Sequence, residues 1–291
     1  MKQTVIVYNN YVEISRKSER LFIKTAHTKN SFPLSNIDGI LIFGKAKLTS
    51  DAISLCMKRQ IPILLLNIYG GVKAQILPPI NSETMRKRLK QVGLYFLKRL
   101  DIAKYIVKRK CLEIEYVFDI DLDYFKIKVD QVNNYAVLLG LEGQVSKIMF
   151  QKFEEMIEPT SFNFKERNYH PPKDEVNALL SFVYTLGYNL STALILLKGF
   201  DPYVSFLHSK RGAHAAFSSD LMEIIRPKLT HFCGEILLNK LITKEDFIKK
   251  DNYIMMKKAS IPKILTEFSE IKEELLEILK EFFVEFEEFK F

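Results

Sequence analysis

A stretch of 22 residues, 176–197, contains no charged side chain, and it limits the possible folds more than any other part of the chain. Its length alone matches a membrane-spanning helix, which is one alternative. However, polar residues such as Asn177 and Asn189 recur through it, and Gly187 lowers its helix propensity. We therefore expect a central helix, buried on all sides within a helical domain. Gly199, two residues further on, is expected to end that helix as a C-terminal cap.

The first 77 residues have the pattern of strands. Asn9-Asn10 lies between two apolar runs and predicts a hairpin, because Asn tolerates the positive φ of tight turns. One short helix is expected to interrupt the strands, with Thr49, Ser50 or Asp51 as its cap. The expected strands are runs rich in β-branched, leucine and aromatic residues, namely VIVYN, YVEIS, LFIKT, GILIF and IPILLLN.

A pair of prolines, Pro78-Pro79, marks the end of this region, because proline removes a backbone donor and restricts the residue before it. Beyond it, apolar residues recur at helical spacing in 86–110, in 133–157 and from Thr266 to the end. The sequence therefore predicts an α+β protein with a β-rich N-terminal domain and a larger all-α catalytic domain. The predicted bounds are 1–78 for the first domain, 79–84 for a linker and 85–291 for the second.

The charge is distributed unevenly. The net charge is +8, but residues 261–291 hold nine Glu against four Lys, so residues 1–260 carry +13. Ten basic residues and a single acid, Asp101, lie between positions 86 and 110. Such an excess favours contact with nucleic acid or another anionic surface, the alternative being a basic protein without such a partner. Three cysteines without a CxxC pair, and a start that lacks signal-peptide features, predict a cytoplasmic protein.

The stretch 199–227 gathers residues that can bind a metal ion. Asp220 and Glu223 are three residues apart at an expected helix start, so both carboxylates can point at one spot, and His208 precedes them. Helix capping for the acids and a structural hydrogen bond for the histidine are the alternatives. One imidazole with carboxylates suits Mn²⁺ or Mg²⁺ better than structural zinc. In a basic protein this chemistry indicates a metal-dependent nuclease.

Glu142 lies on the apolar line of the helix expected over 133–157, between Leu139 and Val145. A carboxylate facing a core must find a partner or lose its charge. The alternative is a glutamate at the edge of the apolar stripe that reaches water.

The chain resembles the CRISPR-associated protein one family, the endonuclease-integrases of CRISPR adaptation. That family has a Gly-x-Asp-Pro turn, a Phe-Leu-His, and an Asp-Leu-Met-Glu followed by Arg-Pro. This chain has the same motifs, in the same order, at 199–202, 206–208, 220–223 and 226–227. Further resemblances, extending over nearly the whole chain, are Pro171 to Tyr184, Leu141-Glu142-Gly143, Pro33 to Ile37 and Ile42 to Gly44.

The resemblance implies roles for individual residues. Glu142, His208 and Glu223 would be the ligands of Mg²⁺ or Mn²⁺, and Asp220 a nearby catalytic acid. Two departures stand out, because Ser205 replaces a frequent Gly and His214 replaces an Arg at a phosphate-contacting position. Four further residues match positions in or near the family's site and would contact nucleic acid, namely Asn177, Lys210, Arg211 and Arg226.

The same resemblance implies a homodimer that acts on DNA and assembles with the small CRISPR-associated protein two, away from any membrane. The expected function is insertion of foreign DNA into a CRISPR array by transesterification. The alternatives are a general metal-dependent nuclease for branched or repair DNA and a non-catalytic DNA-binding scaffold with the same fold.

Overall fold

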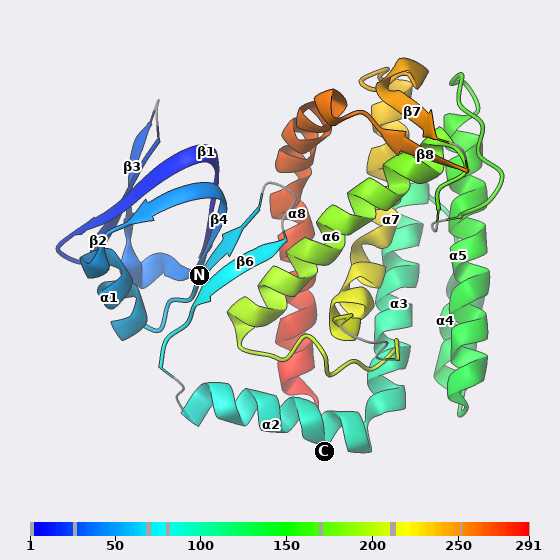
Figure 1. Ribbon diagram of the computed structural model, residues 1–291. Coiled ribbons are helices and arrows are strands. Elements are labelled where there is room, and N and C mark those ends of the chain that lie inside the picture. Colours follow the sequence, from blue (N-terminus) through cyan, green and yellow to red (C-terminus); the bar gives the residue numbers. More distant parts are fainter. Residues whose placement is uncertain are drawn as a thin grey trace. The chain divides into compact units, whose positions relative to one another are not determined.

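The computed structural model describes residues 3–25, 28–67, 71–79, 82–168, 171–209, 214–250 and 252–290 (Figure 1). The chain divides into two compact units. One comprises Met1–Val92 with Thr192–Pro202, and the other comprises Gly93–Ser191 with Tyr203–Phe291. The division falls inside two long helices, and the predicted linker at 79–84 remains a prediction.

The first unit is built on a six-stranded mixed sheet with the strand order β3-β2-β1-β4-β5-β6. β1 pairs in parallel with β4, and β4 with β5, whereas the outer strands pair antiparallel. The strands are β1 (Gln3–Lys17), β2 (Arg20–Lys24), β3 (Lys29–Pro33), β4 (Ile37–Leu48), β5 (Ile63–Leu66) and β6 (Val72–Ile76), with a 3₁₀ turn, η1 (Leu34–Asn36), before β4.

The helix α1 (Ser50–Lys58) follows β4 and supplies part of the core of this sheet. Thr49 caps it, because its hydroxyl accepts a hydrogen bond from the backbone N–H of Ala52 at 3.3 Å. The predicted short helix is therefore confirmed. Its buried side chains Ala52, Leu55 and Cys56 belong to one cluster with Val12, Leu21, Ile40 and Ile63 of the strands.

The hairpin predicted at Asn9-Asn10 is wrong, because β1 continues through both residues. The register against β4 shifts there, with Asn9 opposite Gly44 and Tyr11 opposite Lys45, so that Asn10 is the extra residue of a bulge. Gly44 opposite the bulge has φ +103°, a conformation that glycine adopts without steric cost. The chain instead reverses after Lys17, at Ser18, whose φ is +52°.

The rest of the chain is mostly helical, which confirms the α+β class. The helices are α2 (Ser82–Leu97), α3 (Arg99–Phe118), α4 (Asp123–Gln131), α5 (Tyr135–Ile157), α6 (Glu175–Lys198), α7 (Ala216–Leu238) and α8 (Ile261–Glu288). A small hairpin of β7 (Phe247–Lys250) and β8 (Tyr253–Met256) adds the only paired strands described outside the first sheet, flanked by η2 (Lys244–Asp246) and η3 (Lys258–Ser260).

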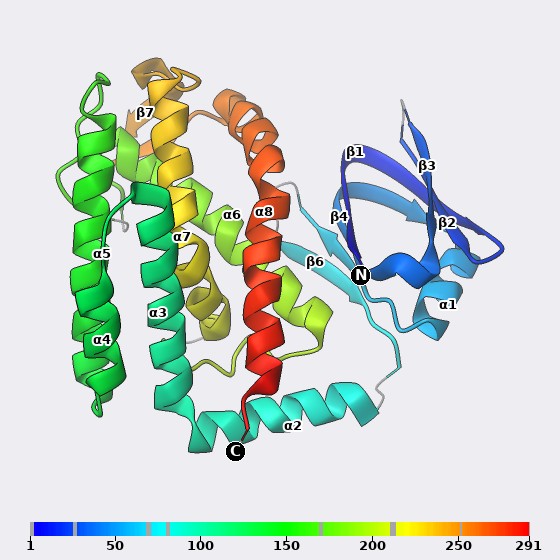
Figure 2. The same ribbon diagram turned by 180° about the vertical axis from the view of Figure 1, so that it is seen from behind.

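α7 is the central helix of the second unit, where it lies between α3, α5 and α8 (Figure 2). It is buried along nearly its whole length, including Asp220 and Glu223. The helix α6 contains the uncharged stretch 176–197, which was expected to be buried on all sides, but its Thr185 is exposed. In the described part of the chain, α6 alone is long and apolar enough to cross a membrane, but 61% of its most apolar window is buried, as in a core helix.

Gly199 ends α6 with φ +85°, as the sequence predicted. A Cβ at this backbone angle is strained, so we expect Gly199→Ala to lower the free energy of unfolding by about 1–2 kcal/mol. Gly140 is the control, because a Cβ there would meet no atom within 4 Å on the surface of α5. Gly140→Ala is expected to raise the free energy of unfolding by roughly 0.5–1 kcal/mol. A urea titration of both variants measures the two effects. Equal effects of the two changes would contradict the capping role.

Candidate active site

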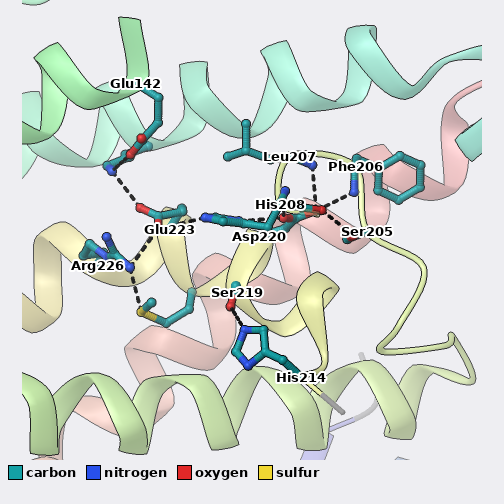
Figure 3. A network of polar contacts seen from close by, with 12 residues as sticks. Glu142, Ser205, Phe206, Leu207, His208, His214, Ser219, Asp220, Glu223 and Arg226 are labelled. Carbon is teal, nitrogen blue, oxygen red and sulfur yellow. Dashed lines mark hydrogen bonds and ion pairs between the residues drawn. The ribbon is translucent and has the colours of Figure 1, made fainter. Parts of the chain in front are cut away.

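Asp220, in the second turn of α7, organises a loop rather than facing solvent. Its buried carboxylate accepts hydrogen bonds from three consecutive backbone N–H groups (Figure 3). Oδ2 accepts from Phe206 at 2.6 Å and Leu207 at 3.0 Å, and Oδ1 accepts from His208 at 2.7 Å. The loop that carries His208 is thereby wrapped around one charged group, whose charge strengthens each of these bonds.

A second set of contacts holds the same loop from α3 and α5. Arg99 donates from Nε to the carbonyl oxygen of Phe206 at 3.1 Å, and the hydroxyl of Tyr135 donates to that oxygen at 3.2 Å. The Arg99 guanidinium also lies over the rings of Tyr95 and Tyr135, at 5.2 and 4.6 Å from their centres. The backbone before His208 is therefore bound by Asp220 at its N–H groups and by Arg99 and Tyr135 at the carbonyl oxygen of Phe206.

His208 is oriented by Asp220. Its Nδ1 lies 2.9 Å from Asp220 Oδ1, and an ionised carboxylate only accepts, so Nδ1 carries a proton and, in the neutral ring, the lone pair is on Nε2. Nε2 points toward Glu223, 3.7 Å from Oε1, and the side chain is 36% exposed (Figure 3). Burial lowers the pKa of His208, but the Asp220 hydrogen bond and the Glu223 charge outweigh it and raise the pKa above its usual value.

Glu223 lies one turn after Asp220 on the same face of α7 and is 2% exposed. Its Oε2 accepts from Lys110 Nζ at 2.7 Å, and its Oε1 forms an ion pair with a terminal nitrogen of Arg226, 2.8 Å away. Burial alone would raise the pKa of Glu223, but Arg226, Lys110 and His208 together lower it to about 2. Glu223 is thus ionised at neutral pH despite its burial.

Glu142 on α5 faces the same place from the other side. Its Oε1 accepts from Lys110 Nζ and from Ser146 Oγ, the latter at 2.9 Å, and its side chain is 17% exposed. Of the two alternatives left by the sequence, the partnered carboxylate is the one observed. Glu142 and Glu223 therefore share the ammonium of Lys110, and His208 Nε2 lies 3.7 Å from Glu223, although the three residues come from α5, a loop and α7.

Lys110 is the residue of this site that sequence reasoning missed. It was counted among the ten basic residues of 86–110, yet it is completely buried on α3. The signal was present, because Ile106, Val107 and Ile114 place position 110 on the buried line of the helix. Much of the remaining basic run is also paired within the protein, as in Lys98 with Asp101, Lys108 with Asp130 and Arg109 with Glu281 and Glu285.

The donor set fits a hard divalent ion. Two ionised carboxylates and an imidazole nitrogen with its lone pair are ligands that Mn²⁺ and Mg²⁺ accept. Among the described residues, the one group of three such side chains whose ligand atoms lie within 4.8 Å of one another is Glu115, Asp121 and Asp123; the ligand atoms of Glu142, His208 and Glu223 are spaced more widely, with Lys110 between the two carboxylates. Lys126 pairs with Glu115 at 2.6 Å and with Asp123 at 2.8 Å, and no described imidazole joins the group. We therefore favour the site that contains His208.

The residues predicted to contact nucleic acid have different surroundings. Asn177 is fully buried, and its amide accepts from Arg167 at 2.9 Å and donates to Asp174 at 2.7 Å. Arg226 lies over the Tyr184 ring at 5.1 Å, and its buried Nε has no hydrogen-bond partner among the described residues. Lys210 and Arg211 lie outside the described residues. Among the described residues of this set, Arg226 therefore has the side chain that lies beside the carboxylate of Glu223.

The two departures from the family pattern have local roles. Ser205 donates from Oγ to the carbonyl oxygen of His208 at 2.6 Å, so its hydroxyl supports the same loop. The His214 ring stacks on Tyr188 with ring centres 5.0 Å apart, and its Nε2 lies 2.7 Å from Ser219 Oγ.

The chain is similar to known proteins. The model of a family described as CRISPR associated protein Cas1 matches residues 5–270. A CRISPR-associated endonuclease Cas1 of Thermus thermophilus is 34% identical over 80% of this chain and 73% of the relative. Two solved structures share the fold. A casposase bound to integration product has a TM-score of 0.72 at 24% identity, covering 93% of this chain and 86% of that chain. A partial Cas6-RT-Cas1–Cas2 complex has a TM-score of 0.79 at 20% identity, covering 96% and 94%.

Proposed function

Because the chain belongs to the Cas1 family of CRISPR-associated proteins, we propose that it is a metal-dependent DNA endonuclease-integrase of CRISPR adaptation. The observation that carries the proposal is the meeting of Glu142, His208 and Glu223 at one site. Carboxylates beside an oriented imidazole can hold a divalent ion for phosphodiester chemistry. We propose Mg²⁺ or Mn²⁺ as the ion.

The proposed reaction exchanges one phosphodiester for another. A DNA 3′-hydroxyl oxygen forms a bond to phosphorus in the repeat, the bond to the leaving 3′-oxygen breaks, and the hydroxyl proton ends on the leaving oxygen. A bound divalent ion would stabilise the charge that develops on the phosphate. The protein contributes the fixed geometry: Asp220 keeps the Nδ1 of His208 protonated, and Arg226 places a cation beside Glu223.

The proposed partners are DNA, a second copy of the chain and the small CRISPR-associated protein two. One structural neighbour is a casposase bound to an integration product, and another is a complex of Cas1 with Cas2. The arrangement of Arg226 at the edge of the carboxylates supports a phosphate-bearing substrate, because its guanidinium is a strong phosphate donor.

The test is a strand-transfer assay with a labelled DNA duplex, a repeat-containing acceptor and Mn²⁺ or Mg²⁺. We expect Glu142→Ala and His208→Ala each to lower the rate of joining at least about a hundredfold, because each removes a group that holds the ion. Glu154→Ala is the matched control, because Glu154 is exposed on the same helix as Glu142. Undiminished joining by both site variants would overturn the proposal. Cleavage of branched DNA without joining would assign the chain to the general nucleases instead.

A further inference from the structure

The site already contains a cation of its own. The ammonium of Lys110 has no exposed surface and lies between the carboxylates of Glu142 and Glu223. Its third donor reaches Ser146 Oγ at 2.6 Å, so all three N–H bonds are directed at oxygen. A lysine is rarely buried completely unless it is paired, and this one is paired twice.

Lys110 is held in this place by its own helix. α3 packs against α7, which carries Glu223, and against α5, which carries Glu142. The preceding residue, Arg109, is bound to Glu281 at 3.1 Å and Glu285 at 3.4 Å on α8. The helix contacts therefore fix the ammonium between the two carboxylates.

The charges around the site nearly cancel. Glu142, Glu223 and Asp220 contribute three negative charges, and Lys110 and Arg226 contribute two positive ones. With His208 neutral, as a metal ligand must be, the net charge is −1. One divalent ion changes this to +1, and one phosphodiester group then restores neutrality. An ion alone would leave an excess of positive charge in a buried place, which is costly.

We propose that Lys110 is a positioning residue that holds Glu142 and Glu223 together without metal and keeps metal binding weak until a DNA phosphate is present. This inference rests on the proposed function, because it takes DNA as the substrate. The proposal implies that bound metal raises the affinity for DNA and that bound DNA raises the affinity for metal, because each supplies the charge that the other needs.

The test is a Mn²⁺ titration by calorimetry on chelator-treated protein, with and without a DNA duplex, for wild type and Lys110→Met. Removing a positive charge next to the ion is expected to raise the Mn²⁺ affinity of the free protein at least about tenfold. The gain in affinity caused by DNA is expected to be smaller in Lys110→Met than in wild type. Unchanged or weaker Mn²⁺ binding by a folded Lys110→Met would overturn the inference.

Lys108→Met is the matched control, because Lys108 lies on the same helix and pairs with Asp130 at the surface. Its Mn²⁺ affinity is expected to equal that of wild type, and a rise equal to that of Lys110→Met would overturn the inference.

Thermal unfolding with and without Mn²⁺ provides a second readout, which also detects a Lys110→Met variant that is only weakly folded without metal. Without metal this variant is expected to melt below wild type, because two buried carboxylates lose their cation. Mn²⁺ is expected to restore the loss, and failure to restore it would overturn the inference. Neither readout uses catalysis, so tight Mn²⁺ binding by Lys110→Met without strand transfer by wild type would sustain this inference while refuting the proposed function.

Discussion

Asp220→Ala is expected to lower the free energy of unfolding by about 3–5 kcal/mol and to remove most strand transfer. The change leaves the backbone N–H groups of Phe206, Leu207 and His208 without an acceptor, the first two in a buried place and the third in a partly buried one. Each buried donor left unsatisfied costs about 1–3 kcal/mol. The His208 ring also loses the contact that fixes its orientation.

Urea unfolding followed by circular dichroism measures the first effect, and the strand-transfer assay measures the second. Asp246→Ala is the control, because Asp246 also accepts a backbone and a side-chain donor, from Thr243 and Ser260, but its side chain is 16% exposed. We expect this control to cost about 1 kcal/mol, as the loss of a helix cap does, and to leave strand transfer unchanged. A loss below about 1 kcal/mol for Asp220→Ala would show that the loop does not depend on this carboxylate.

The sequence predicted the elements of this site better than their contacts. Periodicity placed Glu142 on the apolar line of its helix and left open whether it faced the core or the edge of the stripe, and the Asp220–Glu223 spacing placed both acids on one face of α7. These are local relations, set by 3.6 residues per turn. The partners of Asp220 could not be predicted in this way, because they are backbone groups 12–14 residues away, and every residue type has a backbone N–H.

Lys110 shows a second reason why part of the site could not be predicted from the sequence. In a run of ten basic residues, one lysine resembles the next, and charge runs are usually solvated. Lys110 differs from the other lysines only in its spacing from Ile106 and Ile114, which places it on the buried side of α3. That spacing predicts a buried ion pair only when the two carboxylates that face Lys110 are already known. The bulge at Asn10 was missed for a similar reason, because Asn-Asn serves a turn and a bulge equally well, and the pairing of β1 with β4 decides between them.

Glu223→Gln is expected to cost more stability than Glu142→Gln, although both should remove strand transfer. Glu223 is 2% exposed and contacts two cations, Lys110 and Arg226, whereas Glu142 is 17% exposed and contacts Lys110 alone among the described cations. Breaking a buried ion pair on one side leaves an uncompensated charge, at about 3–5 kcal/mol. Glutamine keeps the shape and one acceptor, so we expect a loss of about 3 kcal/mol for Glu223→Gln and about 1 kcal/mol for Glu142→Gln.

The pH dependence of unfolding separates this charge effect from a loss of packing. The pKa of Glu223 is lowered from 4.5 to about 2 in the folded protein, so its charge stabilises the fold above the unfolded-state value and ceases to do so as the pH falls toward 2. In chelator-treated protein, the difference between wild type and Glu223→Gln should therefore be largest near neutral pH and shrink below about pH 4. A difference that stays constant down to pH 3 would mean that packing, and not the ion pairs with Lys110 and Arg226, sets the cost. The pairing with Arg226 and Lys110 thus keeps Glu223 ionised across the physiological pH range, which is the state that the proposed metal site requires.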